Sequence, residues 1–176
     1  MVNPPRVLVI DDDESIRATL QAILDNEGYV VEVAATGTDA IKKSKDAVYN
    51  VALIDIKLPD MEGTELLTRM RDSVPRTRKI IVTGYPSIQN AMDAVNNNAD
   101  AYLTKPVDVD KLLRIVGEQV KLQQAEKKYS EKKVAEFIAA RVGEIRKTEI
   151  RLTQFFQYFI LFPNSKLDVT LKLKPT

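Results

Sequence analysis

The chain has 176 residues, of which 44% are hydrophobic and 29% are charged. This composition is typical of a globular protein with a buried core, and the length fits one domain with an appendage or two very small domains. The sequence contains neither cysteine nor histidine, which excludes disulfides and thiolate nucleophiles and removes the commonest general base and metal ligand. Any reactive chemistry must therefore come from carboxylates, hydroxyls, lysine or tyrosine.

The net charge of +1 is unevenly distributed along the chain. Residues 1–120 contain 14 Lys and Arg against 19 Asp and Glu, whereas residues 121–176 contain 12 against 6. This shift predicts a domain boundary near residue 120. The first residues lack the apolar core of a signal peptide, and no apolar run approaches the ~20 residues of a membrane span. We therefore expect a cytoplasmic protein without a membrane span.

Short apolar runs alternate with segments of helical periodicity over the first two thirds of the chain. The run at residues 7–10 is β-branched, typical of a strand that is buried on both faces of a parallel sheet. The helical spacing that follows stops at residues 26–28, which end in glycine. The further predicted strands are residues 30–33, 51–54, 80–82 and 101–103, and the further helices follow each of them, beginning near Thr36, near Leu66, near Ile88 and near Val109.

Five such strand–helix units predict a parallel sheet with helices on both faces. The expected fold class is α/β, a flavodoxin-like doubly wound sheet of five strands in the order 2-1-3-4-5, followed by a long α-helical extension. In open sheets of this kind, ligands bind outside the carboxyl ends of the strands, where the strand order reverses. The residues directly after each strand are therefore the candidates for function.

The residues at these strand ends form a chemically coherent set. Asp11 and Asp12 follow the first strand, Asp55 the third, Thr83 the fourth and Lys105 the fifth. Adjacent carboxylates repel one another, and a hard divalent cation with oxygen ligands, such as Mg²⁺, relieves that repulsion. A hydroxyl and a lysine beside them complete a pocket for Mg²⁺ and a small dianion such as a phosphoryl group.

Each of these residues also has a purely structural interpretation. The acidic residues 11–14 favour the positive end of the next helix, and Asp55 is an acceptable residue at the end of any strand. Thr83 suits a turn, and Lys105 suits the surface. The functional interpretation is favoured because four separate strand ends each supply a group that one site needs.

Four sequence blocks resemble the signature motifs of two-component response-regulator receiver domains, and the resemblance covers about residues 5–120. The blocks are residues 7–17 (VLVIDDDESIR), 50–63 (NVALIDIKLPDMEG), 80–85 (IIVTGY) and 101–106 (AYLTKP). The segment from Thr83 to Pro106 is similar to receivers of enhancer-binding transcription activators. Asn98 departs from the glycine of many relatives, but Asn tolerates positive φ, so we expect the turn to be kept.

The resemblance implies a role for each matched residue. Asp55 would be the phosphoacceptor, Asp11 and Asp12 would hold Mg²⁺ with it, and the backbone carbonyl of Lys57 would complete the metal ligands. The phosphate-binding and switch residues would be Thr83, Gly84, Tyr102, Lys105 and Pro106, with a cis Lys105–Pro106 bond.

The implied function is that of a response regulator, which accepts a phosphoryl group on Asp55 from a sensor histidine kinase and switches protein–protein contacts. It would catalyse its own phosphorylation and lose the phosphate slowly, without being an enzyme in the usual sense. One alternative is a receiver fragment of a larger transcription activator. A Mg²⁺-dependent phosphohydrolase is less favoured, because Lys57 stands where a second carboxylate is wanted. A phosphate-independent scaffold is less favoured because the site residues are retained.

The remainder of the chain predicts a helical extension over residues 121–162. Residues 120–154 contain no proline and one glycine, and apolar residues recur with 4-3 spacing over residues 135–159 except at Glu149. This seam predicts a coiled coil and a parallel homodimer, in which Glu149 would weaken the seam or set its register. Nucleic acid is not indicated, and the output partner is unknown. Residues 163–176 alternate in polarity, and their structure is left open.

Overall fold

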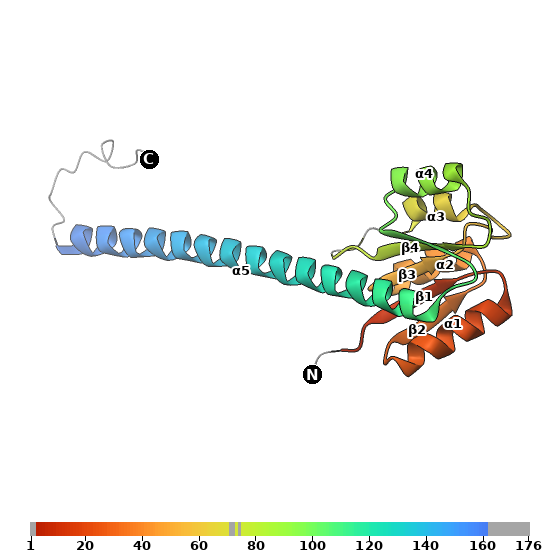
Figure 1. The fold of residues 1–176 in the computed structure, drawn as a ribbon. Coiled ribbons are helices and arrows are strands. Elements are labelled where there is room, and N and C mark those ends of the chain that lie inside the picture. Colours follow the sequence, from red (N-terminus) through yellow and green to blue (C-terminus); the bar gives the residue numbers. More distant parts are fainter. Residues whose placement is uncertain (1–2, 71–72, 74, 162–176) are drawn as a thin grey trace. The chain divides into compact units, whose positions relative to one another are not determined.

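The computed structural model describes residues 3–70, 73 and 75–161 of the chain. The chain divides into two compact units, the first from Met1 to Ser130 and the second from Glu131 to Thr176. The first unit contains a parallel sheet and its covering helices (Figure 1). Its strands are β1 (Arg6–Ile10), β2 (Val30–Ala34), β3 (Val51–Ile54), β4 (Arg78–Thr83) and β5 (Ala101–Thr104). The helices are α1 (Glu14–Asn26), α2 (Gly37–Asp46), α3 (Gly63–Arg69), α4 (Ile88–Asn96) and α5 (Val109–Leu161).

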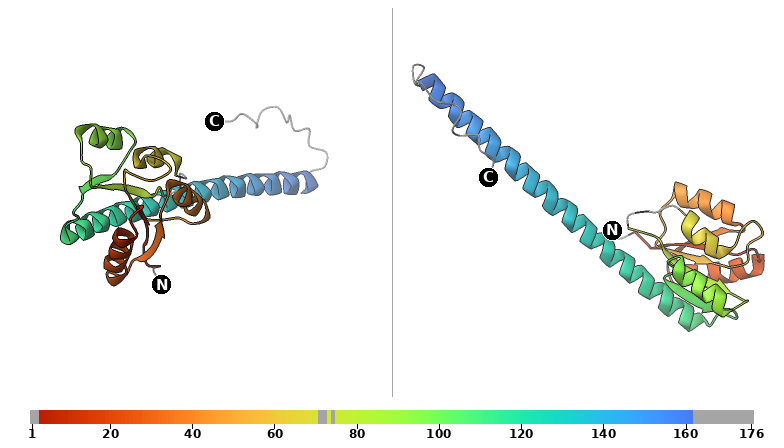
Figure 2. Two further views of the ribbon diagram at one scale, coloured as in Figure 1. Left: turned by 90° about the vertical axis from the view of Figure 1, so that its right-hand side faces the viewer. Right: turned by 90° about the horizontal axis from the view of Figure 1, so that it is seen from above.

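The strand order is β2-β1-β3-β4-β5 and every pairing is parallel, so the predicted fold class is confirmed. Successive side chains of a strand point to opposite faces of the sheet, and both faces are covered (Figure 2). Val7 and Val9 pack with apolar residues of α1 and α5 on one face. Leu8 and Ile10 pack with residues of α2, α3 and α4 on the other. The central strand β3 is an uninterrupted apolar run because both of its faces are buried.

Two turns use backbone conformations that most residues avoid. Gly28 follows α1 with a φ of 84°, and Asn98 follows α4 with a φ of 62°. Asparagine is among the non-glycine residues that enter this left-handed region most readily. The expectation that Asn98 preserves the turn is therefore confirmed.

The strand register brings the carboxyl ends of four strands to one edge of the sheet. Ile10 pairs with Ile54, so the residues that follow them, Asp11 and Asp55, are neighbours. The backbone N–H of Asp55 donates to the carbonyl of Ile10 at 2.8 Å, which continues the pairing by one residue. Thr83 pairs with the residue that precedes Lys105. The sheet thus carries Asp11, Asp55, Thr83 and Lys105 at its carboxyl edge.

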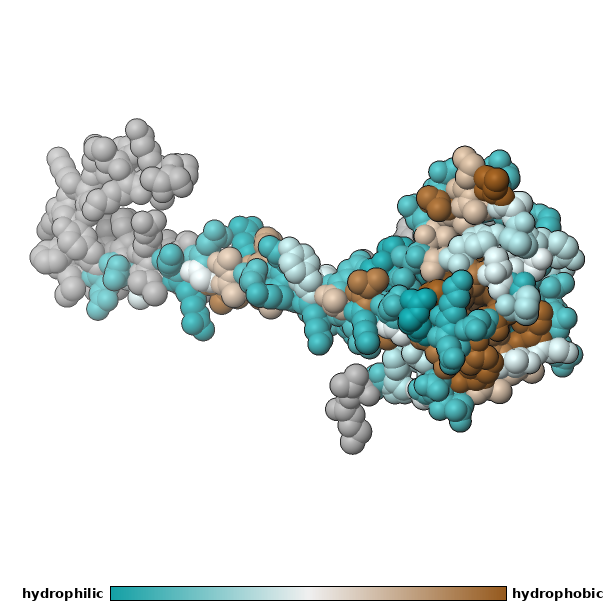
Figure 3. All heavy atoms as spheres, in the orientation of Figure 1, coloured by the Kyte–Doolittle hydropathy of each residue, from teal (hydrophilic) through white to brown (hydrophobic). Residues whose placement is uncertain are grey.

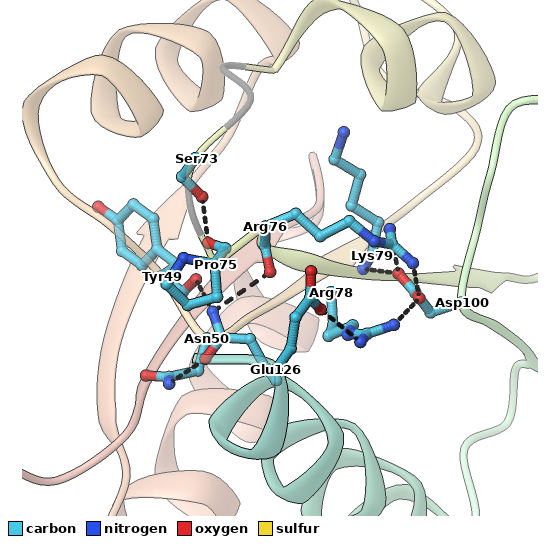
Figure 4. A network of polar contacts seen from close by, with 10 residues as sticks. Tyr49, Asn50, Ser73, Pro75, Arg76, Arg78, Lys79, Asp100 and Glu126 are labelled. Carbon is cyan, nitrogen blue, oxygen red and sulfur yellow. Dashed lines mark hydrogen bonds and ion pairs between the residues drawn. The ribbon is translucent and has the colours of Figure 1, made fainter. Parts of the chain in front are cut away.

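The helix α5 is held on the sheet first by apolar and then by polar contacts. Leu112, Val116 and Val120 are buried in the core, and Gln123 is buried one turn later. Polar residues at the amino-terminal ends of the strands contact polar residues of this part of α5, and we call the whole group the basal network (Figure 4). The basal network consists of Asn50, Arg76, Arg78, Asp100, Gln123 and Glu126.

Gln123 is the centre of this attachment. Its amide nitrogen donates to the carbonyls of Tyr49 and Arg76 at 3.2 and 3.3 Å, and its amide oxygen accepts from Asn50 at 2.6 Å. Nearby, Arg78 donates to Glu126 of α5 at 2.8 Å. These contacts continue the attachment of α5 beyond residue 120, and the first compact unit correspondingly runs to Ser130.

In the second unit, the structure describes a single helix, the continuation of α5 to Leu161, so the predicted long helical extension is confirmed. Its exposed apolar side chains include Val134, Phe137, Ile138, Val142 and Ile145. The part of the seam from Glu149 onward lies largely outside the residues whose side chains are described, and the alternating segment after Pro163 lies outside the described residues. None of the helices described combines the length and apolar character needed to cross a membrane.

We predict that Gln123→Ala lowers the free energy of unfolding by about 1–3 kcal/mol, because the change leaves buried polar partners without their hydrogen bonds. Urea unfolding followed by circular dichroism measures the difference. The matched control is Lys121→Ala, an exposed position on the same helix, which we expect to change the free energy by less than about 0.5 kcal/mol. Equal unfolding midpoints for the two variants would contradict a stabilising role for the basal network.

Candidate functional site

Three carboxylates gather at the carboxyl edge of the sheet, as the sequence predicted. Oxygen atoms of Asp11, Asp12 and Asp55 lie within 4.8 Å of one another. Asp11 and Asp55 are only 2% and 6% exposed, whereas Asp12 is exposed to solvent. The buried pair comes from β1 and β3, the two strands at which the strand order reverses. The cluster therefore has a buried floor and one side that is open to solvent.

Lys105 connects the two buried carboxylates. Its Nζ donates to Oδ2 of Asp11 at 2.6 Å and to Oδ2 of Asp55 at 2.7 Å. The lysine directly follows β5, and its backbone N–H donates to the carbonyl of Thr83 at 2.7 Å. The Lys105–Pro106 peptide bond is cis, as expected. One cation thus joins the ends of β1, β3 and β5.

The pKa values of these groups reflect the competition between burial and charge. Burial raises the pKa of Asp11, although hydrogen bonds from Lys105 and from the backbone of Asp13 act in the opposite direction. Burial alone would lower the pKa of Lys105, but its hydrogen bonds to Asp11 and Asp55 outweigh burial and raise that pKa. The lysine is therefore held as a cation, and its charge is committed to the two acids.

The donor set fits a hard divalent cation. All three side chains offer carboxylate oxygens, which are the ligands that Mg²⁺ prefers. Lys105 contacts the Oδ2 atoms of the buried pair and not their Oδ1 atoms. Oδ1 of Asp11 accepts from the Asp13 N–H at 3.1 Å, and Oδ1 of Asp55 is 3.4 Å from the backbone nitrogen of Lys57. The cluster thus combines two acids bonded to the lysine with the exposed carboxylate of Asp12.

The backbone of Lys57 lies beside the acids, but its side chain is engaged elsewhere. Nζ of Lys57 forms an ion pair with Glu62 at 2.9 Å, and the two residues form an antiparallel bridge that closes the loop after β3. This arrangement leaves the backbone of Lys57, and not its charge, next to Asp55.

Thr83 and Tyr102 lie near the site on β4 and β5. Thr83 is fully buried, and its Oγ1 accepts from the N–H of Tyr85 at 3.1 Å. The hydroxyl of Tyr102 is buried and has no hydrogen-bond partner of normal geometry among the described residues. Burial raises the pKa of Tyr102, and the backbone of Ser87 opposes this effect. At Gly84, an added Cβ would lie 3.8 Å from the Lys105 side chain, so space alone does not demand glycine there.

The acidic run at residues 11–14 contains both a helix cap and residues of the carboxylate cluster. Asp13 is the N-cap of α1, because its Oδ1 accepts from the backbone N–H groups of Ser15 and Ile16 at 2.8 and 3.1 Å. Asp11 and Asp12 instead belong to the carboxylate cluster. Sequence reasoning named Asp11 and Asp12 as site residues but did not identify Asp13 as the cap, although an Asp directly before the helical periodicity is the usual signal for one.

Two further residues were missed. Arg17 of α1 donates to the backbone carbonyl of Asp11 at 2.7 Å and so fixes the chain at the site. Asp60, in the loop between β3 and α3, accepts hydrogen bonds from the first residues of α2. No periodicity or motif identifies either contact in advance, because both depend on how the loops meet.

A cavity of about 450 Å³ lies at the opposite edge of the sheet and not at the acidic cluster. Its lining residues are Leu67, Thr68, Arg76, Thr77, Lys79, Asn97 and Asn98. The charged groups of this cavity already have partners within the protein, since Arg76 pairs with Asp100 and Lys79 donates to the Leu67 carbonyl. We therefore take the acidic cluster as the candidate functional site.

Comparison with known proteins identifies the family of this chain. The family model of the response regulator receiver domain matches residues 7–117. The transcriptional regulatory protein ZraR of Klebsiella oxytoca is 38% identical over 112 residues, which are 64% of this chain and 25% of that protein. The chain thus spans about a quarter of the length of that relative.

Solved structures show the same likeness. A receiver domain protein from Methanospirillum hungatei is 44% identical, with a TM-score of 0.67 over 70% of this chain and 99% of its own. The beryllofluoride-activated receiver domain dimer of NtrC4 is 34% identical, with a TM-score of 0.63 over 67% of this chain and 98% of its own. From the family match, the sheet order and the acidic cluster together, we conclude that this chain belongs to the response regulator receiver domain family.

Proposed function

We propose that the chain is a response regulator of a two-component system, which accepts a phosphoryl group on Asp55 from the phosphohistidine of a sensor histidine kinase. One observation carries the proposal: Lys105 bridges the buried carboxylates of Asp11 and Asp55 beside the exposed Asp12. This arrangement combines a carboxylate nucleophile, an oxygen-ligand cluster and a cation that can pair with a phosphoryl group.

In the proposed reaction, a carboxylate oxygen of Asp55 attacks the phosphorus of the donor. An O–P bond forms while the N–P bond to the kinase imidazole breaks, and the imidazole leaves. A Mg²⁺ ion held by Asp11, Asp12, Asp55 and the Lys57 carbonyl would supply charge neutralisation for this transfer. The Nζ of Lys105 then pairs with the oxygens of the new phosphoryl group instead of with the bare carboxylates.

The proposed response begins at Thr83. Its buried hydroxyl would donate to the phosphoryl group, and its movement would open space for Tyr102, whose hydroxyl has no partner of normal geometry in the described structure. Phosphorylation would then shift the population between two packings because the phosphoryl group makes better contacts in one of them.

A second proposal is that the chain is the receiver part of a larger transcription regulator. Its support is the likeness to ZraR, a transcriptional regulatory protein of which the matched region is 25%. A phosphohydrolase remains less favoured, because the side chain beside Asp55 is Lys57 paired with Glu62, and not a second acid at the site.

The extension supports a further part of the proposal, a homodimer through residues 135–159. The described seam residues Ala135, Ile138, Val142 and Ile145 are all exposed in the single chain. An isolated helix is marginal in water, and its stability comes mostly from packing its apolar face against a partner. A second copy of the same heptad pattern is a suitable partner.

We predict that Asp55→Asn abolishes phosphoryl uptake, because an amide is a far poorer nucleophile than a carboxylate. Intact mass spectrometry after incubation with acetyl phosphate and Mg²⁺ detects the added group in the native chain. The control is Asp25→Asn, which changes an exposed aspartate of α1 outside the cluster and should be phosphorylated like the native chain. Undiminished uptake by Asp55→Asn would refute the phosphoacceptor assignment.

We also predict that Mg²⁺ stabilises the fold through the exposed acid of the cluster. At ten times its Kd, the ion should raise the free energy of unfolding by about 1.4 kcal/mol. Asp12→Asn should remove most of this gain without disturbing the core, since Asp12 is exposed. Thermal unfolding with and without Mg²⁺ measures both effects. A melting temperature that is indifferent to millimolar Mg²⁺ would argue against the metal site.

We predict that the apolar seam of residues 135–159 joins two copies of the chain. The full chain should be dimeric at tens of micromolar, and Ile138→Lys, which places a charge in the seam, should make it monomeric. Ala140→Lys is the control, because position 140 lies off the seam in the same heptad. A chain that ends at Ser130 should be a monomer that still accepts phosphate. Light scattering measures the mass, and a monomeric native chain would disprove the dimer.

A further inference from the structure

The loop between β3 and α3 is tied to the start of α2 by one carboxylate. Oδ1 of Asp60 accepts from the N–H of Gly37 at 2.8 Å. Oδ2 of Asp60 accepts from the N–H and the hydroxyl of Thr38 at 2.8 and 2.6 Å. The first N–H groups of a helix have no partner inside the helix, so Asp60 caps α2 from a distant part of the chain.

This contact is strong although it is exposed. A carboxylate at a helix amino terminus meets the positive end of the helix dipole, and hydrogen bonds to a charged acceptor are stronger than neutral ones. The pKa of Asp60 is lowered to about 2, because the Thr38 hydroxyl and the N–H groups of Thr38 and Gly37 donate to it. The carboxylate therefore stays ionised and bonded at any physiological pH. Since Asp60 is exposed, replacing it removes this contact without opening the core.

Two glycines allow the loop to lie this close to its neighbours. A Cβ at Gly37 would be 2.4 Å from the sulfur of Met61, so the absence of a side chain there makes room for the residue next to Asp60. A Cβ at Gly63 would be 2.0 Å from the backbone oxygen of Asp55, so the far end of the loop lies against the strand end that carries this acid. The N–H of Gly63 also donates to the carbonyl of Ile56 at 2.7 Å.

The loop is thereby fixed on both sides of Lys57. On one side, Lys57 adjoins Asp55, with its backbone nitrogen 3.4 Å from Oδ1 of the acid. On the other side, Lys57 is bridged to Glu62, and Asp60 lies between the two bridged residues and reaches α2. A change at Asp60 therefore acts on the backbone at Lys57 through a short closed loop and not through the core.

We propose that Asp60 is a positioning residue that holds the Lys57 backbone in place for a divalent cation at the acidic cluster. The inference rests on the proposed function, which gives the Asp55 cluster its metal. Asp60 acts through the loop and touches neither the ion nor the phosphoryl group. A role as a simple helix cap is the alternative, and it predicts a change in stability without a change in metal affinity.

The matched control changes the other side chain that caps α2. Thr36 is the N-cap of α2, and its hydroxyl accepts from the N–H of Asp39 at 3.1 Å. Thr36→Ala therefore weakens the start of α2 without breaking the tie to the loop. Asp60→Ala breaks the tie, and Asp60→Asn retains one acceptor oxygen and so part of it.

The experiment is a Mg²⁺ titration of the native chain and the three variants by isothermal calorimetry, with the amide resonance of Lys57 followed by NMR. We expect Asp60→Ala to weaken Mg²⁺ binding about tenfold, the order of magnitude seen when residues that orient metal ligands are substituted. Asp60→Asn should weaken it less and should remain folded, and Thr36→Ala should not weaken it. The Lys57 resonance should shift in both Asp60 variants and not in Thr36→Ala.

Native Mg²⁺ affinity in both Asp60 variants would overturn the inference while leaving the proposed function intact. An equal loss of affinity in Thr36→Ala and Asp60→Ala would overturn it too, because the effect would then come from the helix and not from the tie. If the native chain neither binds Mg²⁺ nor accepts a phosphoryl group, the proposed function itself fails, and this inference fails with it.

Discussion

Two buried carboxylates in one place need a compensating charge, and the rest of the first unit is arranged to provide it. Asp11 and Asp55 lose much of their hydration at the carboxyl edge of the sheet, and Nζ of Lys105 contacts both of them. An uncompensated buried charge costs several kcal/mol, so the contacts of Lys105 with both acids stabilise their ionised forms. They come from the ends of β1, β3 and β5, and only a sheet that runs all three strands in the same direction brings them to a single edge.

The two edges of the sheet use polar groups in different ways. At the amino-terminal edge, charges and amides are matched to one another: Asp100 pairs with Arg76 and Arg78, and Gln123 bonds two carbonyls and Asn50. At the carboxyl edge, the two buried acids share one lysine, and the exposed Asp12 adds a third carboxylate beside them. A matched network resists change because every rearrangement breaks a hydrogen bond, whereas an undercompensated cluster responds to a ligand. The first edge therefore suits attachment of α5, and the second suits chemistry.

Exposed apolar side chains occur on two helices. Apolar side chains gather over α4 (Figure 3), where Ile88, Met92 and Val95 are exposed. In the second unit, Val134, Phe137 and Ile138 are exposed on α5. Exposed apolar groups that cluster on a helix favour contact with another surface over contact with water. Surfaces of this kind are compatible with the output by protein–protein contact that we propose.

The sequence by itself determined the elements, their order and most of the site. Apolar runs, helical spacing and turn residues are local signals, and the doubly wound order places Asp11, Asp55 and Lys105 together once the five units are recognised. Tertiary structure alone decided the contacts between segments that no local pattern relates. Gln123 has the sequence character of an ordinary polar helix residue, yet it is buried against the segments that lead into β3 and β4. Asp60 is an ordinary turn residue in sequence, yet it caps α2, because loop geometry and the space at Gly37 place its carboxylate there. Such contacts depend on distances set by the packed sheet, and a one-dimensional pattern does not contain them.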